Sequence, residues 1–439
     1  MNRYPTYYFV ILFLAFLLST IFWWLLLRDF NSSLIQVNTA GNYNESIYEF
    51  RPIDPDKIIV DKENNRKVIS NIVNIAVKDT LSKTKDFISE FHKSYKQSDY
   101  QIIYADSTLN FIQIEVPDDQ RIAFKNEIKE KMSPFELLVW DESLFSSNET
   151  NSKPDFEWFL RETNLSGSVA NIDASDITIA IIDNGFDIYH PALIGRTYLP
   201  YNVIDKSENV QPRPENHGTH VASIAAGNQV SEANFHGICQ TAKIMPIKIE
   251  DDNGYMTTTY IIKGILYAIK NKADVINLSL GLQSLNKISV EEQQNYMEFG
   301  AKDEESFWNE VFTYAEKNNT ICVLAAGNSA MLTGVDPFQR SPKTIKVGAI
   351  DQNLQRTSFS NYGSYTTIFA PGKDILGAKP GNKFEMLEGT SMAAPIITGF
   401  VALLKSQNKK RSNAEIFALL HKNTELVNNL PILKYKTLN

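Results

Sequence analysis

The chain has 439 residues, of which 43% are hydrophobic, and its formal net charge is −8 at pH 7. This apolar content is enough for a sizeable core, and 20 glycines and 17 prolines are too few for a collagen-like or low-complexity sequence. The mildly acidic balance gives no reason to expect a nucleic-acid partner. Two cysteines, Cys239 and Cys322, are too few for a disulfide framework or a four-cysteine zinc site, and we expect both to be unpaired.

An uncharged apolar run covers residues 7–27. As a helix it would span about 30 Å, which matches the hydrocarbon core of a bilayer. It is longer than the apolar region of a signal peptide, and the tryptophans near its end do not resemble a cleavage site. We therefore expect one transmembrane anchor within residues 1–29. Arg3 before the run, with Arg28 offset by Asp29 after it, favours a cytoplasmic N-terminus and an external body.

Residues 30–66 have no strong periodicity and are predicted to be a linker. In residues 67–147 the hydrophobic pattern alternates between the strand period of 2 residues and the helix period of 3.6 residues, which indicates a small domain. The patterns predict strands over 68–77, 101–105, 109–116 and 135–140, and helices over 83–95 and 117–132. Asp118 and Asp119 are placed in the first turn of the second helix. The order βαββαβ is the ferredoxin-like α+β plan, which hosts many functions.

The rest of the chain is predicted to be a linker and domain entry over residues 148–170 and a large domain over residues 171–430. Short apolar runs such as 177–182 alternate there with helical patterns such as 261–270. This alternation predicts an α/β fold with a parallel sheet flanked by helices. Catalytic residues of such folds usually follow the carboxyl ends of strands.

Three polar residues lie at strand ends or helix starts, where such a fold usually has its catalytic residues: Asp183, His217 and Ser391. Each alone has an ordinary structural interpretation, as a turn residue, a structural histidine and a helix N-cap. Together they fit a nucleophilic serine at a helix start, a histidine base and a carboxylate that orients the imidazole. The combination, in the order Asp, His, Ser, favours the catalytic interpretation.

This order and its local strings resemble the subtilisin-like serine proteases, or subtilases. The similarity covers about residues 155–425. Further matching strings lie at residues 190–191, 251–254, 273–281, 325–329, 358–363 and 369–372. The resemblance implies a serine endopeptidase with Asp183, His217 and Ser391 as its catalytic triad.

The resemblance also implies roles for residues around the triad. Asn328 matches the asparagine that donates its side-chain amide to the oxyanion, beside the backbone N–H of Ser391. Two apolar segments match those that line the pocket for the residue before the scissile bond, so we expect apolar or aromatic side chains there. These segments are Ser279, Leu280 and Gly281, and Ala325, Ala326 and Gly327.

Several positions depart from the family pattern. Asn184 replaces the commoner Thr or Ser, and Ile396 replaces a common His, but neither is a catalytic group. Ala192 stands where many members have a calcium-binding Asp, so calcium is not indicated and we expect no metal or cofactor. Residues 283–309 form an insertion that could add a specificity wall or a partner surface, or could be a solvated helix.

Subtilases commonly carry an inhibitory propeptide of the βαββαβ plan, and the resemblance gives residues 67–147 that role. The chain is then a zymogen that cuts itself within residues 143–153, with Leu144 and Phe145 as apolar side chains for the pocket. Its expected partners are protein or peptide substrates, its own propeptide and the membrane.

Two other classes of function stay open from the sequence. A catalytically silent scaffold could keep the fold, although this chain retains the triad and Asn328. A metallohydrolase could use His217 and His220, which share a helix face at i and i+3. No nearby glutamate or third ligand completes a known zinc spacing, which disfavours it.

Overall fold

The computed structural model describes residues 53–61, 66–78, 83–133, 135–146, 157–165, 167, 169, 172–213, 217–282 and 288–438. The predicted transmembrane run, residues 7–27, lies outside these residues. None of the described helices combines the length and the apolarity needed to cross a membrane.

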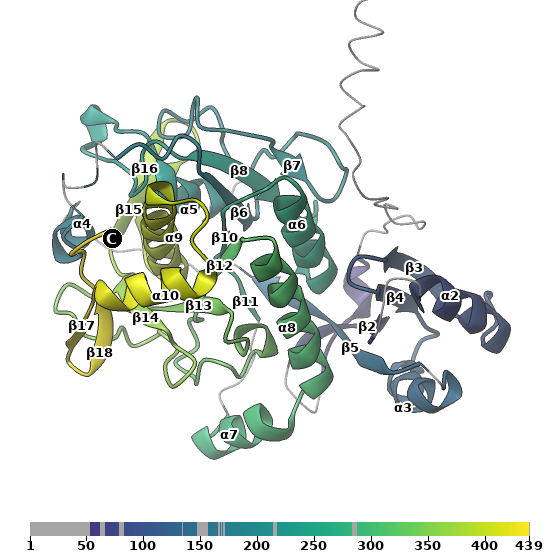
Figure 1. Cartoon of the computed structure of the whole chain (residues 1–439). Coiled ribbons are helices and arrows are strands. Elements are labelled where there is room, and N and C mark those ends of the chain that lie inside the picture. The colour runs from purple at the N-terminus through teal and green to yellow at the C-terminus, as the bar shows by residue number, and fades with distance from the viewer. Residues whose placement is uncertain are drawn as a thin grey trace, which may run out of the picture. The chain divides into compact units, whose positions relative to one another are not determined.

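The N-terminal domain is an antiparallel sheet with two helices, in the predicted βαββαβ order (Figure 1). Its strand order is β5-β2-β4-β3, and a short strand, β1, pairs with β2. The elements are β1 (Ile58–Val60), β2 (Lys67–Val77), α2 (Lys83–Ser94), β3 (Gln101–Asp106), β4 (Phe111–Glu115), α3 (Arg121–Lys131) and β5 (Leu137–Ser146), with a 3-10 turn over Pro55–Lys57.

Alternation along β2 gives this sheet two buried faces. Val73 and Ile75 pack with the helices α2 and α3, whereas Ile72 and Ala76 belong to a second cluster. That cluster also contains Phe307 and Trp308 of the C-terminal domain. Because successive side chains of a strand point to opposite faces, one strand contributes both to the core of its own domain and to the interface between the domains.

The main differences of this domain from the sequence prediction are an extra strand and the bounds of α3 and β5. Strand β1 lies within the predicted linker, because three residues are too few to show a period. Helix α3 begins at Arg121, since Asp119 has a left-handed backbone (φ 65°), so no acidic residue lies in its first turn. Strand β5 continues six residues beyond residue 140 because its polar residues are buried in the interface.

The C-terminal domain is built on a sheet in the order β17-β18-β14-β13-β12-β10-β6-β8-β7. All neighbouring pairs are parallel except β17 and β18. The strands are β6 (Thr178–Asp183), β7 (Tyr201–Asn202), β8 (Lys243–Lys248), β10 (Val275–Leu278), β12 (Ile321–Ala325), β13 (Thr344–Ile350), β14 (Ile368–Pro371), β17 (Thr424–Val427) and β18 (Leu430–Leu433).

Helices cover both faces of this sheet, which confirms the predicted α/β architecture. Ile179 and Ile181 of β6 pack in a cluster with α5 and α9, and Ala180 and Ile182 pack in one with α6 and α8. The helices are α4 (Trp158–Glu162), α5 (His217–Ala226), α6 (Thr258–Lys270), α7 (Val290–Phe299), α8 (Lys302–Lys317), α9 (Thr390–Gln407) and α10 (Asn413–Lys422). Short 3-10 turns cover Ser231–Ala233 and Pro337–Gln339.

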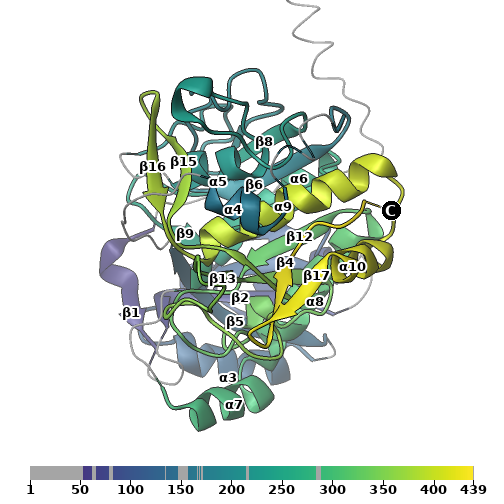
Figure 2. The same ribbon diagram turned by 90° about the vertical axis from the view of Figure 1, so that its left-hand side faces the viewer.

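Four short strands lie outside the main sheet. The hairpin of β15 (Ile375–Lys379) and β16 (Lys383–Leu387) lies beside α5 (Figure 2). Strands β9 (Met256–Thr257) and β11 (Gly281–Leu282) both pair with β5, the last strand of the N-terminal domain. Strand β5 therefore belongs to both domains.

Candidate active site

Asp183 ends β6 at the carboxyl edge of the sheet, and its carboxylate is completely buried. His217 Nδ1 lies 2.8 Å from Asp183 Oδ1 and 2.9 Å from Oδ2. The backbone N–H of Asn184 also donates to Oδ1, at 2.7 Å. Contact with a carboxylate places the imidazole proton on Nδ1, so Nε2 becomes the basic nitrogen of His217.

His217 is the first residue of α5, and close packing around Gly218 holds it against Asp183. A Cβ at Gly218 would collide with the carbonyl oxygen of Gly185, so only glycine allows the helix to start this close to β6. The side-chain oxygen of Asn184 accepts the N–H of Gly218 at 3.0 Å. Asn184, noted from the sequence only as a departure from the family, thus ties the Asp183 strand to the His217 helix.

His220 is buried one turn further along α5, and its surroundings differ from those of His217. Its Nε2 lies 3.2 Å from the carbonyl oxygen of Glu385. Burial lowers the pKa of His220 to about 3, so this imidazole stays neutral at neutral pH. Within the described part of the chain, no group of three or more His, Cys, Asp or Glu residues could hold a metal ion.

Ser391 lies in the first turn of α9, and it contacts Ser279 in both directions. Its hydroxyl donates to the carbonyl oxygen of Ser279 at 3.3 Å, and Ser279 Oγ donates to the carbonyl oxygen of Ser391 at 2.9 Å. Asn277 Nδ2 donates to Ser279 Oγ at 2.9 Å, and Thr398 Oγ1 donates to Asn277 Oδ1 at 2.8 Å. This chain of hydrogen bonds fixes the pocket segment against the nucleophile helix.

Asn328 is held by the residue before Ser391. Its Oδ1 accepts both the backbone N–H of Thr390, at 2.9 Å, and the Thr390 hydroxyl, at 2.8 Å. Thr390 Oγ1 also accepts the N–H of Gly327 at 3.1 Å. Since these contacts use the amide oxygen, the Nδ2 donor of Asn328 is the group oriented for another acceptor.

The structure thus brings the predicted residues into two hydrogen-bonded groups. One joins Asp183 to His217, and the other joins Ser391 and Asn328 to the two pocket segments. Helices α5 and α9 pack against each other and unite the groups. Ala325 ends β12, Ala326 follows it, Leu280 lies between β10 and β11, and all three are buried; Gly281 begins β11.

Thr390 and Asn277 are positioning residues that the sequence analysis did not single out. Asn277 is a polar residue in the completely buried strand β10, and a buried amide needs hydrogen-bond partners. That requirement could have marked Asn277 from the sequence. The partners themselves, Ser279 and Thr398, are 2 and 121 residues away, so the connection to α9 needed the fold.

Strand β5 lies along the edge of this site, paired with β9 on one side and β11 on the other. Phe145 is opposite Met256 and Leu282, and Ser146 is opposite Gly281. The Phe145 ring packs edge-on to Phe338, with centroids 5.9 Å apart. In the uncut chain Phe145 thus packs on Phe338, and the expectation that Leu144 and Phe145 fill the pocket beside the scissile bond stays a prediction.

Both cysteines are unpaired, as predicted. Cys239 and Cys322 are buried, and Cys322 lies in β12. Burial raises the pKa of each thiol to about 12, so neither is a reactive thiolate at neutral pH.

Solved structures share this architecture. Fervidolysin from Fervidobacterium pennivorans superposes with a TM-score of 0.67 at 19% identity, over 90% of this chain and 63% of its own. The epidermin leader peptide processing serine protease from Staphylococcus aureus gives a TM-score of 0.65 at 19% identity, over 83% of this chain and 97% of its own. At this identity the likeness establishes the fold.

Sequence relatives establish the family. The chain is 37% identical over 238 residues to a thermophilic serine proteinase of Bacillus sp. (strain AK1), a match that spans about half the length of that protein. It is 33% identical over 241 residues to thermitase of Thermoactinomyces vulgaris, covering 55% of this chain and 79% of thermitase. The model of the subtilase family matches residues 174–435, more than half of the chain. The geometry around Asp183, His217 and Ser391 and these comparisons agree: the chain belongs to the subtilase family of serine peptidases.

Proposed function

We propose that the chain is a serine endopeptidase that works through an acyl-enzyme. The observation that carries this is the buried contact of His217 Nδ1 with both oxygens of Asp183, in a domain of the subtilase family. The carboxylate holds the imidazole in the tautomer whose Nε2 can accept a proton, and it stabilises the imidazolium that then forms.

The reaction follows in two halves. Ser391 Oγ attacks the carbonyl carbon of the scissile bond while its proton passes to His217 Nε2. The C–N bond then breaks, and the leaving amine takes that proton. Water repeats the sequence: it gives its proton to His217 and attacks the ester, and Ser391 recovers its proton as the acyl product leaves.

The negative oxygen formed in each half needs donors. The backbone N–H of Ser391 points from the first turn of α9, where N–H groups have no intrahelical acceptor. Asn328 Nδ2 is the second donor, since Thr390 holds the other end of its amide. Protein or peptide substrates would bind as an extended strand in the place that β5 occupies, between β9 and β11.

The N-terminal domain is the inhibitor of this site in our proposal. Its strand β5 fills the cleft edge, and its Gln113 donates to Thr259 Oγ1 of α6 at 2.8 Å. Trp140 and Phe111 stack near Phe307 of α8, with centroids 4.5 and 5.4 Å from that ring. A substrate can pair with β9 and β11 only after β5 has left.

Activation would begin with a cut by the chain itself within residues 143–153. Ser146 lies opposite Gly281, and the two strands are antiparallel, so the residues that would lie opposite Ser279 come later in the chain than Ser146. We therefore expect the cut after Ser146, in the later part of that window. The apolar run of residues 7–27 would anchor the precursor to a membrane with its body outside the cytoplasm. The cut would separate the catalytic domain from that anchor.

One experiment tests these proposals together. The full chain is expressed in wild-type form and as Ser391→Ala, and each product is labelled with a covalent serine-hydrolase probe and sequenced from its N-terminus. We expect probe labelling and a new N-terminus only for the wild type. A wild-type protein that binds no probe and cleaves no casein would instead be the silent scaffold, and an active but uncut protein would contradict self-processing.

A further inference from the structure

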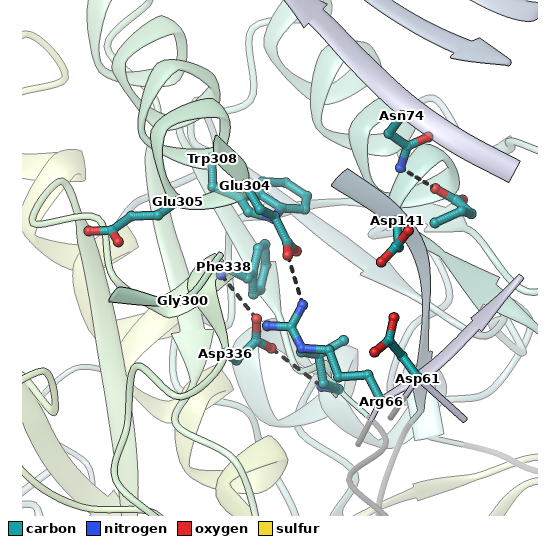
Figure 3. Close-up of polar contacts among 12 residues, drawn as sticks. Asp61, Arg66, Asn74, Asp141, Gly300, Glu304, Glu305, Trp308, Asp336 and Phe338 are labelled. Atoms are coloured by element: carbon teal, nitrogen blue, oxygen red, sulfur yellow. Dashed lines mark hydrogen bonds and ion pairs between the residues drawn. The ribbon is translucent and has the colours of Figure 1, made fainter. Parts of the chain in front are cut away.

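A buried ion pair joins the two domains (Figure 3). Arg66 of the N-terminal domain extends its guanidinium to Glu304 of α8, with 2.7 Å between Nη1 and Oε2. The side chains are only 7% and 3% exposed. Asp336 lies on the other side of the guanidinium in the same close-up (Figure 3). Tyr296, Glu304 and Asp336 of the C-terminal domain thus form a receptor around the guanidinium of Arg66.

Contacts within the C-terminal domain alone hold this receptor in shape. Trp308 Nε1 donates to Glu304 Oε1 at 3.4 Å. The carboxylate of Asp336 accepts the backbone N–H groups of Phe338, at 3.0 Å, and of Leu282, at 3.4 Å. The ring of Tyr296 lies 5.6 Å from the centre of the Arg66 guanidinium. Each carboxylate therefore has contacts within the C-terminal domain besides any with Arg66.

The receptor also adjoins the path of a bound peptide. Leu282, which donates to Asp336, belongs to β11 and pairs with Phe145. Ser143 and Phe145 are two residues apart on β5 and so face the same side of the strand. Phe145 packs on Phe338, and Ser143 lines a cavity of about 470 Å³ together with Arg66, Tyr296 and Glu304.

Electrostatics favour a cation in this place. Burial is the main cause that raises the pKa of Asp336 to about 6; Arg66 acts against this shift and Glu304 adds to it. Two carboxylates held against Trp308, Tyr296 and Phe338 are partly shielded from water, so a positive charge interacts with them more strongly than at an open surface. A planar guanidinium can also lie over the ring of Tyr296, which an ammonium does less well.

We propose that Tyr296, Glu304 and Asp336 form a second recognition site, which binds an arginine side chain of the substrate. That arginine stands two residues before the substrate residue that packs on Phe338. Arg66 fills the site in the precursor, and the substrate fills it once the N-terminal domain has left. The inference rests on the proposed function, because it needs peptides to enter the cleft in place of β5.

The test uses peptides with the wild-type chain after maturation. An internally quenched peptide carries residues 140–153 of this chain, with Ser143 retained or replaced by arginine, lysine or citrulline, the neutral analogue of arginine. We expect kcat/KM for the arginine peptide to exceed that for the citrulline peptide by about tenfold or more, with lysine between them. The difference should lie in KM and should shrink in 1 M salt, which screens charges.

Matched variants assign the effect to the receptor. Glu304→Gln should bring the arginine and citrulline peptides to within about twofold of each other, because it removes the charge that the guanidinium contacts. Glu298→Gln is the control, since Glu298 is an exposed residue of α7 in the same insertion, and it should keep the full preference.

The outcomes separate the two proposals. Equal rates for all four peptides on the wild-type chain, or a preference that persists in Glu304→Gln, would overturn the arginine site and leave the proposed peptidase intact. Failure to cleave any of the four peptides, together with no labelling by the serine-hydrolase probe, would overturn the peptidase and, with it, the arginine site.

Discussion

Glu142 of the N-terminal domain lies at the N-terminus of α6 in the C-terminal domain, where its carboxylate accepts the backbone N–H of Thr259 at 3.3 Å. The other oxygen accepts Asn74 Nδ2 at 2.6 Å. Burial raises the pKa of Glu142, whereas these hydrogen bonds lower it. A carboxylate at a helix start complements the positive end of the helix dipole, so Glu142 joins strand β5 to the C-terminal domain.

Glu142→Ala should weaken the hold of the N-terminal domain, because Asn74 and the first turn of α6 lose a buried acceptor. We expect the mature activity to appear several-fold sooner after expression, measured with a quenched peptide over time. Glu136→Ala is the matched control: Glu136 forms an exposed pair with Lys78, which contributes little. Equal delays in both variants would show that Glu142 does not hold the domain.

Ser391→Ala and His217→Ala should each lower kcat by about 10⁶, and the double variant should lose little more, as the corresponding changes do in subtilisin. The reason is that the base has no proton to accept without the nucleophile, and the nucleophile is not activated without the base. Steady-state kinetics on a quenched peptide measures this. Losses that multiply in the double variant would mean that the two residues act independently.

Asn328→Ala should lower kcat by about 10²–10³ with little change in KM, the size of loss known for the matching donor in subtilisin. The amide is needed when the oxyanion forms, not when the substrate binds. Because Asn328 also holds Thr390, a thermal melt should accompany the kinetics. A KM effect without a kcat effect would place Asn328 in substrate binding instead.

Activity should fall as the pH drops from 8 to 5, because a protonated His217 cannot accept the Ser391 proton. His220 cannot be the source of this acid limb, since its pKa of about 3 means that it remains neutral throughout the range. The pH profile of kcat/KM gives the measurement. A flat profile over this range would remove His217 from the role of base.

The ionic contacts of the N-terminal domain differ in kind. Arg121 pairs with Asp61 and Asp141 inside the domain, whereas Arg66 pairs with Glu304 across the interface. Removing one partner of a buried pair leaves an uncompensated charge, so Arg66→Ala should cost far more inhibition than loss of the exposed Lys78–Glu136 pair.

The sequence by itself determined the chemistry of the site. Asp183, His217 and Ser391 each stand in a short local string with a strand end or a helix start, so local patterning was enough to place them. The βαββαβ order was also readable, because regular periods of 2 and 3.6 need no long-range partner.

Only the tertiary structure decided how the parts meet. Arg66 and Glu304 are 238 residues apart, and nothing local to either one indicates the other. From its sequence, strand β5 resembles an ordinary edge strand, whereas the fold pairs it with β9 and β11 and packs Phe145 on Phe338. Burial and register depend on which surfaces pack together, and local periodicity carries no information about distant partners.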